Sequence, residues 1–393
     1  EKEFSALITL NIVLSIGALL LMSLGSFFIT NDPAIRKIIW VLSFFILITS
    51  FFGIFYAFLR SRQKMEYEAG IKIAQNLIMV GVVLFIVSNF PSAIHLSYAY
   101  LFSNVVALCF LLLTFHFCFI PLKLSWTKNI FNILKVSWPL SLGFMTSWIY
   151  ISISSIMLGY FNLLAESGWY GAASKIALAT AIPADLIIRS FYPALSGFFI
   201  NSKEKLQRSW DHLMELMILL VIPTVTGGIA LAPKIIYFFY GFSFAPSIFA
   251  FQLLMCVIGV SFISYPFSLI LVVCNQQKKN FFLIIGGVVM SSIMGFILIP
   301  IYGFYGMIAV TIIVSLSILF LTVITVKYST PVSIINMKFL KGALIASVSS
   351  LVMLYVIRLP AVYNLNIFYS IITGTVIYSI ILYFLYKVTF LKR

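Results

Sequence analysis

Trp169–Phe199 reads WYGAASKIALATAIPADLIIRSFYPALSGFF, an apolar segment of transmembrane length that nevertheless carries Lys175, Asp185 and Arg189. A charged side chain at the centre of a membrane helix costs about 2.5 to 3.5 kcal/mol, so such a helix is expected to turn its charges toward protein or water. At about 100° per residue, Arg189 falls about 40° and Asp185 about 80° from Lys175 around the axis. The segment therefore predicts one polar face on an apolar helix, which we interpret as the lining of a cavity.

The rest of the chain is as apolar as this segment. Hydrophobic residues make up 62% and charged residues 9% of its 393 positions. Lipid cannot satisfy backbone hydrogen bonds, and the apolar runs are about 20 residues long, so the membrane spans must be helices. We predict an all-α polytopic membrane protein with about 12 transmembrane helices.

Charged residues in the loops predict how the chain is oriented. Nineteen Lys and Arg residues fall in one set of alternate loops or at the two ends of the chain, and three fall in the opposite set. Because cytoplasmic loops carry the excess of positive charge, we expect both ends of the chain in the cytoplasm. The same placement explains the net charge of +15 without a nucleic-acid partner. The predicted spans are 4–30, 38–59, 73–90, 98–121, 138–160, 172–200, 213–239, 247–274, 281–300, 305–326, 342–357 and 366–387.

A cytoplasmic segment near the first third of the chain predicts a boundary between two helical lobes. Residues 123–137 read KLSWTKNIFNILKVS and place Trp126, Ile130, Ile133 and Leu134 on one side of a helix, which is typical of an amphipathic helix on the membrane surface. The predicted parts are an N-terminal lobe of four spans at 1–122, this linker at 123–137, a C-terminal lobe of six spans at 138–326 and an additional helix pair at 327–393.

Several spans contain kink-forming or small residues. Proline removes a backbone donor, so a kink is expected where it falls inside a span. Small residues at every fourth position let another helix approach closely. The prolines are Pro183, Pro223 and Pro266, and the small residues are Gly287, Ser291 and Gly295.

A series of ordered landmarks resembles one family of membrane proteins, the polysaccharide (Wzx-type) flippases, which belong to a superfamily that also contains multidrug exporters and the lipid II flippase. Each landmark is short, but they follow one another at the ends of successive spans over much of the chain. They are Leu134–Leu140 (LKVSWPL), Met157–Phe161 (MLGYF), Trp169–Lys175 (WYGAASK), Phe191–Ser196 (FYPALS), Tyr240-Gly241, Phe244–Pro246 (FAP), Asn275–Gln277 (NQQ) and Ile299–Gly306 (IPIYGFYG).

The resemblance implies a MATE-like fold, with two six-helix lobes around a central cavity and an additional helix pair. It also implies that two helices precede Glu1. The implied function is flipping of undecaprenyl-diphosphate-linked oligosaccharides across the bacterial inner membrane for O-antigen or capsule assembly, with other polysaccharide-assembly proteins as partners. This chain departs from the family in one helix, Trp138–Tyr160, where relatives often carry an acidic residue and this sequence has Ser152, Ser154 and Ser155.

Each charge of the polar face has two interpretations that stay open. Arg189 either binds the diphosphate or acidic sugars of the cargo with its planar guanidinium or forms an i,i+4 pair with Asp185 that only braces the helix. Asp185 either serves this pair or couples transport to H⁺ or Na⁺. Lys175 lies about one turn into the span predicted from residue 172, and it is either a substrate-binding group or an interfacial anchor.

Other classes of function find little support in the sequence. The chain has no GxxxxGK[ST] phosphate loop, and His95, His116 and His212 share no helix face, so we expect neither a nucleotide cofactor nor a metal. A multidrug exporter of the same superfamily is the nearest alternative, and it would be expected to line its cavity with acidic residues. A membrane glycosyltransferase or polymerase acting on the same lipid carrier needs carboxylates in its outer loops, which offer only Asp32 and Glu166. We therefore predict that the chain is not an enzyme.

Overall fold

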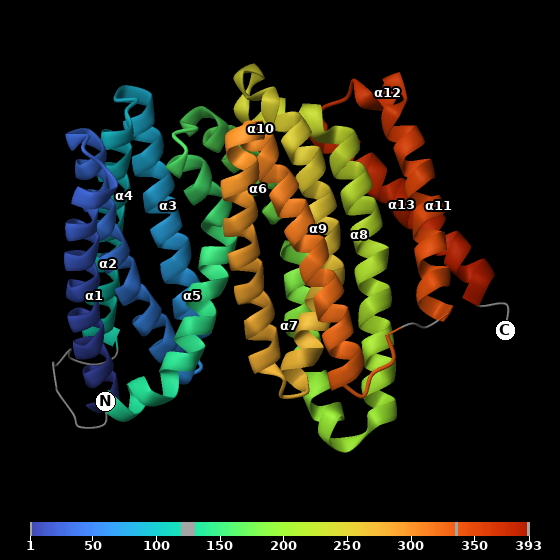
Figure 1. The fold of residues 1–393 in the computed structure, drawn as a ribbon, viewed down its shortest axis with the longest axis horizontal. Coiled ribbons are helices and arrows are strands. Elements are labelled where there is room, and N and C mark those ends of the chain that lie inside the picture. The colour runs from blue at the N-terminus through green and yellow to red at the C-terminus, as the bar shows by residue number, and fades with distance from the viewer. Residues whose placement is uncertain (1, 119–129, 335–336, 391–393) are drawn as a thin grey trace. The chain divides into compact units, whose positions relative to one another are not determined.

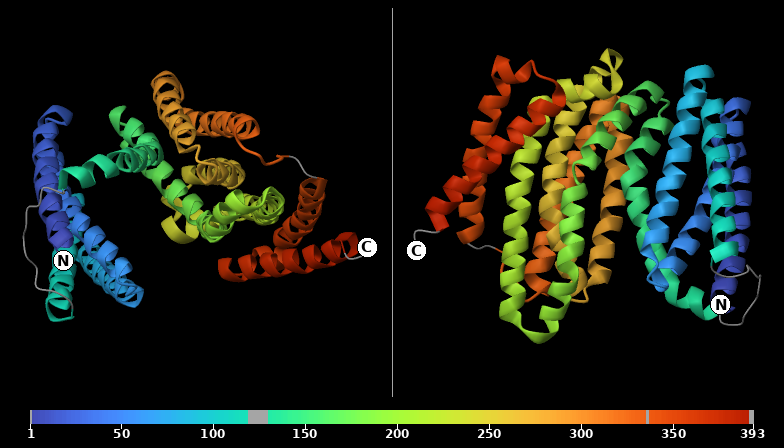
Figure 2. Two further views of the ribbon diagram at one scale, coloured as in Figure 1. Left: turned by 90° about the horizontal axis from the view of Figure 1, so that it is seen from below. Right: turned by 180° about the vertical axis from the view of Figure 1, so that it is seen from behind.

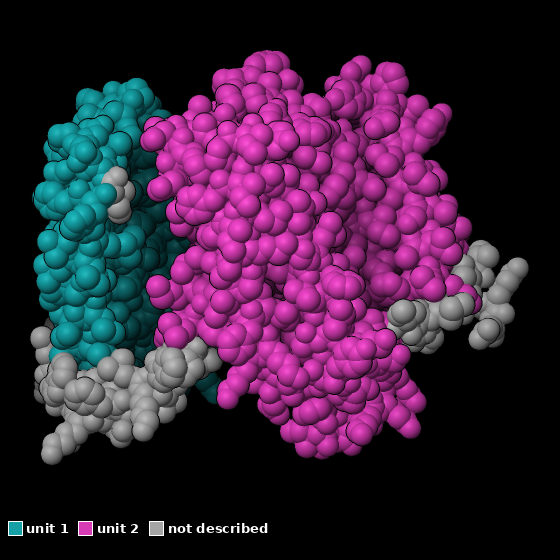
Figure 3. Space-filling model, in the orientation of Figure 1, with its two compact units in different colours: residues 1–139 teal, residues 140–393 magenta. Residues whose placement is uncertain are grey.

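The computed structural model describes residues 2–118, 130–334 and 337–390, and every regular element in these residues is a helix (Figure 1). This confirms the all-α prediction. The helices fall into two compact units, residues 1–139 and residues 140–393 (Figure 3). The predicted amphipathic linker at 123–137 lies outside the described residues, apart from the backbone where α5 begins at Ile130.

The first unit is built around an aromatic core between its helices. The α2 helix packs against α1 and α4, and α3 packs against α4 (Figure 1). The rings of Phe55 and Phe115 meet edge to face with centroids 4.5 Å apart, and Phe4 lies against Phe58 at 4.4 Å. Such pairs add about 0.5 to 1.5 kcal/mol beyond the area they bury. The four helices are α1 (Lys2–Ile29), α2 (Pro33–Ser61), α3 (Met65–Asn89) and α4 (Ala93–Cys118).

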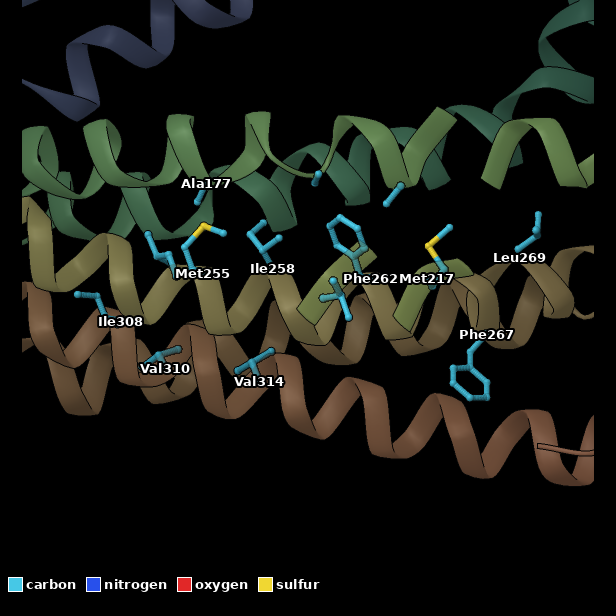
Figure 4. Packing of buried hydrophobic residues seen from close by; sticks show 14 of the residues in the cluster. Ala177, Met217, Met255, Ile258, Phe262, Phe267, Leu269, Ile308, Val310 and Val314 are labelled. Atoms are coloured by element: carbon cyan, nitrogen blue, oxygen red, sulfur yellow. The ribbon is translucent and has the colours of Figure 1, made fainter. Parts of the chain in front are cut away.

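The second unit is organised around α9, which contacts α6, α7, α8 and α10 (Figure 2). Met255, Ile258 and Phe262 of α9 belong to the buried core between these helices (Figure 4). The helices are α5 (Ile130–Tyr160), whose first residues belong to the other unit, α6 (Leu164–Ala179), α7 (Ile182–Asn201), α8 (Lys203–Tyr240), α9 (Pro246–Val273), α10 (Gln277–Ser329), α11 (Met337–Arg358), α12 (Pro360–Tyr363) and α13 (Ile367–Phe390).

The α10 helix is a hairpin of two arms that reverses at Gly303 (Figure 1). Gly303 has φ +57° and ψ −138°, a conformation that side-chain-bearing residues rarely adopt. At the far end of the hairpin, the Lys279 ammonium donates to the Ser329 hydroxyl at 2.7 Å, so the two ends of α10 lie together. The two arms correspond to the spans predicted at 281–300 and 305–326.

The number of membrane helices agrees with the sequence prediction. Within the described residues, 10 helices are long and apolar enough to cross a membrane, or up to 11 if the bent pair α6–α7 forms one span. The count of 11 includes α10 as a single helix. Because α10 consists of two arms, each of which can be one span, the total is twelve. Many large apolar side chains are exposed on these helices, as expected for surfaces that face lipid.

The stripe of small residues on the first arm of α10 is a site of close packing, as predicted. A Cβ atom added at Gly295 would lie 2.5 Å from the Met157 side chain of α5, and one added at Gly287 would meet the Ile318 side chain of the second arm. Ser291, between them, is buried. The small residues therefore let α5 and both arms of α10 approach closely.

The last helices of the chain are attached to α8. The α11 helix packs against both α8 and α13. Lys234 of α8 donates to the Leu365 carbonyl at 2.9 Å and to the Ser370 hydroxyl at 3.1 Å, and its ammonium lies over the Tyr363 ring at 4.6 Å. Lys234 thus joins α8 to the α12–α13 connection.

Candidate functional site

The predicted polar face lies on a broken helix. The α6 and α7 helices meet at an angle of 42°, with Thr180 and Ala181 between them. Pro183 stands in the first turn of α7, and because it has no N–H it cannot donate to the carbonyl four residues earlier, where α6 ends. The kink predicted at Pro183 is therefore confirmed, whereas Pro223 and Pro266 lie inside helices that continue across them.

Asp185 and Arg189 form an ion pair on α7. The Arg189 Nε donates to Asp185 Oδ2 at 2.7 Å, and the two side chains are 75% and 52% exposed, with Arg189 the more exposed. Within the described residues this is the one hydrogen bond of the Arg189 guanidinium, so both terminal nitrogens are open. An exposed i,i+4 pair contributes only about 0.3 to 0.5 kcal/mol to stability. The pair predicted from the spacing is present, and it leaves most of the guanidinium donors available to another group.

Arg189 lies deep along its helix. It is about 18 Å from the end of α7 at Asn201, measured along the axis. The Arg189 side chain is not buried in the core of unit 2, so it is exposed at the surface of this unit. Lipid is a costly neighbour for such a charge, and water or a bound anion is a favourable one.

Lys175 is exposed and stands apart from this pair. It makes no hydrogen bond or ion pair with the described residues. Since α6 begins at Leu164, Lys175 lies about three turns from the start of its helix, whereas the span predicted from residue 172 has it about one turn in. Lys175 and Asp185 are about 15 Å apart along the helix pair. The structure therefore brings together two of the three predicted charges.

Unit 1 contains a charged network that was not predicted from the sequence. Glu68 is 8% exposed and lies between two cations: Arg60 donates to it through Nε at 2.8 Å and Nη2 at 3.0 Å, and Lys72 donates at 2.6 Å. Beyond it, Tyr56 donates to Gln75 at 3.0 Å. The spacing of Glu68 and Lys72 was the available signal, but both cations were assigned to a loop.

The Glu68→Gln variant is expected to destabilise the protein by about 1 to 3 kcal/mol, because it leaves two cations without their shared carboxylate. The cations are about half exposed, so water offsets part of the loss. The midpoint of thermal unfolding of the purified protein measures the effect. Glu66→Gln is the matched control, because Glu66 is exposed and lies 3.9 Å from Lys64. Equal midpoints for the two variants would contradict the structural role of Glu68.

Glu166, predicted only as an outer-loop carboxylate, caps the second arm of α10. Its Oε2 accepts a hydrogen bond from the Phe304 N–H at 2.6 Å, directly after the reversal at Gly303. Asp32 does the same for α2, accepting from the Ala34 N–H at 2.8 Å. Both carboxylates therefore satisfy the free backbone donors of a helix start.

No group of metal ligands is present in the described part of the chain, where no three His, Cys, Asp or Glu side chains lie close enough to hold an ion. Of the charges predicted on the polar face, Lys175, Asp185 and Arg189 are all exposed and accessible to a ligand.

A comparison with models of protein families shows to which family the chain belongs. A family model described as "Polysaccharide biosynthesis protein" matches residues 1–249. The chain belongs to this family. A comparison with the sequences of curated proteins finds no match.

Solved structures share the fold. The lipid II flippase MurJ in an inward closed conformation is similar with a TM-score of 0.76 and 18% sequence identity, over 98% of this chain and 83% of that chain. An inward-facing multidrug resistance MATE family transporter of the MOP superfamily is similar with a TM-score of 0.66 and 16% identity, over 81% and 79%. A MOP superfamily transporter from Pyrococcus furiosus gives a TM-score of 0.55 and 15% identity, over 83% and 80%. The chain is thus a polysaccharide biosynthesis protein with a MurJ- and MATE-like membrane fold, as predicted.

Proposed function

We propose that the chain is a flippase that moves undecaprenyl-diphosphate-linked oligosaccharides from the cytoplasmic to the outer face of a bacterial inner membrane, for surface polysaccharide assembly. Membership of a polysaccharide biosynthesis family supports the cargo class, and a fold shared with a lipid II flippase supports the activity. Both ends of the chain lie in the cytoplasm, as the excess of Lys and Arg in those loops predicts. The two lobes alternate between access to either side, and other polysaccharide-assembly proteins supply and take over the cargo.

The observation that carries the proposal is the exposed guanidinium of Arg189. Without cargo its Nε donates to Asp185, while neither terminal nitrogen makes a hydrogen bond with a described residue. The planar guanidinium can donate hydrogen bonds to two phosphate oxygens at once. Such charge-assisted hydrogen bonds are about twice as strong as those between neutral groups. Arg189 therefore binds the diphosphate as the cargo crosses the membrane.

Asp185 connects this binding to an ion gradient. When a diphosphate draws the guanidinium away, the carboxylate loses its ion-pair partner. A carboxylate that has lost its cation can take a small cation, H⁺ or Na⁺, as the new partner. We infer that cargo and coupling ion meet on this pair, with Lys175 as a further cation along the cargo's path.

The charges of α6–α7 disfavour the two alternatives. A multidrug exporter of cationic compounds is also consistent with the MATE-like fold, but the exposed charges Lys175, Asp185 and Arg189 are net positive. A glycosyltransferase or polymerase needs a free acid or base beside its substrate. Asp32 and Glu166, the carboxylates offered for that role, are both engaged as helix caps.

A reconstituted transport assay tests the proposal. The purified protein in proteoliposomes is expected to expose a fluorescent, diphosphate-linked oligosaccharide lipid to a membrane-impermeant quencher faster than protein-free vesicles do. A cationic dye in the same vesicles serves as the exporter's substrate. Transport of the dye without movement of the lipid would favour the exporter and contradict the proposal.

A further inference from the structure

A cavity inside unit 2 has many hydroxyl-bearing residues in its wall. It has a volume of about 330 Å³ and lies between α5, α6, α9 and α10. More than half of its lining residues are Ser, Thr or Tyr, and among the described residues no Asp, Glu, Lys, Arg or His lines it. Its size is at the lower end of the range for small-molecule sites. It is thus an uncharged and largely apolar site that carries several hydroxyl groups, within the membrane-spanning part of the unit.

Two buried serines of this cavity have no partner in the described part of the chain. Ser154 of α5 is 6% exposed and Ser291 of α10 is 3% exposed, and neither makes a hydrogen bond with any described residue. Both line the cavity, and neither oxygen is fully occluded by protein. Each hydroxyl can donate one hydrogen bond and accept two, so its hydrogen-bonding capacity is open toward the cavity. Their free donors and acceptors therefore point to a ligand in the cavity.

Other hydroxyls around the cavity are already oriented. Tyr170 and Thr311 lie within hydrogen-bond distance at 3.3 Å, and Ser315 donates to the Thr311 carbonyl at 2.7 Å. A hydroxyl whose proton is committed in this way keeps lone pairs for an incoming donor. The cavity thus offers fixed acceptors beside the two free serines, and Tyr150 and Tyr170 add aromatic surface.

The hydroxyl groups and the absence of charged residues among the described lining residues indicate which kind of ligand the cavity can bind. A cation would find no carboxylate among the described lining residues, and an anion would find no basic group there, so either would be a poorly compensated charge in a low-dielectric site. A neutral group with several hydroxyls can both donate and accept around its rim and place its C–H faces against the tyrosine rings. A sugar ring has these properties.

We propose that this cavity binds an uncharged sugar ring of the cargo, while Arg189 binds the diphosphate. This assignment deepens the proposed function and rests on it for the link to a lipid carrier. Leu178, at the cavity wall, and Arg189 are separated by about 16 Å along α6–α7, so the two groups of one cargo molecule would occupy different positions on the same helix pair. The seryl side chains on α5 replace the carboxylate expected there, which suits a neutral ligand.

Protection of introduced cysteines from alkylation tests the inference. Ser154→Cys and Ser291→Cys are made in the full chain, and their reaction with N-ethylmaleimide is followed by peptide mass spectrometry. Ser152→Cys and Ser292→Cys are matched controls, since they neighbour these serines on the same helices and do not line the cavity. The exposed Cys256 provides an internal reference. The probes are free glucose, free N-acetylglucosamine, bare undecaprenyl diphosphate, the lipid-linked oligosaccharide and NaCl.

We expect a free sugar at about ten times its dissociation constant to slow alkylation of the Ser154→Cys and Ser291→Cys variants about tenfold, because protection follows 1 + [L]/Kd. The lipid-linked oligosaccharide should protect both variants, while bare undecaprenyl diphosphate and NaCl should protect neither, and the control variants should show no protection by any probe. Protection by the free sugar without protection by the lipid-linked form would uphold the sugar site and count against the proposed function. Protection by NaCl or bare carrier, or by no sugar at all, would overturn the inference.

Discussion

Replacing Arg189 by alanine is expected to slow the appearance of new surface polysaccharide by about 10- to 100-fold in cells that depend on this protein. The estimate corresponds to the loss of one charge-assisted, two-point contact with phosphate, worth about 1.5 to 3 kcal/mol. Arg189→Lys keeps the positive charge but cannot donate to two phosphate oxygens in the planar geometry of a guanidinium, so we expect an intermediate rate. Pulse labelling of the polymer measures the rate, with protein levels checked by immunoblotting.

Arg208 is the matched control for this experiment. It is also exposed and also pairs with a carboxylate four residues away, Glu204, at 3.8 Å, but it lies in the first turns of α8. Arg208→Ala is expected to leave the rate unchanged. If Arg189→Ala and Arg208→Ala had the same effect at equal protein levels, Arg189 would have no special part in transport.

Replacing Gly303 by alanine is expected to destabilise the second unit by about 2 to 4 kcal/mol. The backbone conformation at Gly303 is strained for any residue with a Cβ atom. That atom would also lie 2.8 Å from Glu166 Oε2, so it would displace the carboxylate that caps the next arm at Phe304. The apparent midpoint of thermal unfolding in detergent, followed by the fraction that remains monodisperse, measures the loss.

Three further variants separate the causes of this effect. Gly286→Ala lies in the first arm of α10 with nothing within 4 Å of the added carbon, and it should be neutral or slightly stabilising. Glu166→Gln keeps an acceptor oxygen for Phe304, so we expect a smaller loss than for Glu166→Ala. A Gly303→Ala protein as stable as Gly286→Ala would contradict the described hairpin.

The membrane fold follows from the sequence because its signal is long and repeated. Apolar runs and loop charges predict the spans, and the landmark Ile299–Gly306 correctly marks the end of one arm of α10 and the start of the next. The break between α6 and α7 was predicted at Pro183, where a missing N–H leaves a specific backbone bond unmade. The start of a helix is harder to predict from the sequence. The α6 helix begins at Leu164, in a stretch that carries Glu166 and precedes the apolar run, so the predicted span placed Lys175 too near the helix start.

In the candidate site, only contacts between residues close in sequence were predicted. The Arg189–Asp185 bond is an i,i+4 contact, and such contacts follow from helix geometry alone. The pairing of Glu166 with Phe304 joins residues 138 positions apart, and the cavity of Ser154 and Ser291 depends on how α5 packs against α10. These arrangements require tertiary packing, for which a single sequence carries no periodic signal.

The most direct measurement compares two lipid carriers that bear the same glycan, one joined through a diphosphate and one through an uncharged linkage, in proteoliposomes. The wild-type protein is predicted to translocate the diphosphate carrier faster, Arg189→Ala is predicted to lose that preference, and Arg208→Ala is predicted to keep it. Equal rates for both carriers with the wild-type protein, or an undiminished preference in Arg189→Ala, would contradict the claim that Arg189 binds the diphosphate during transport.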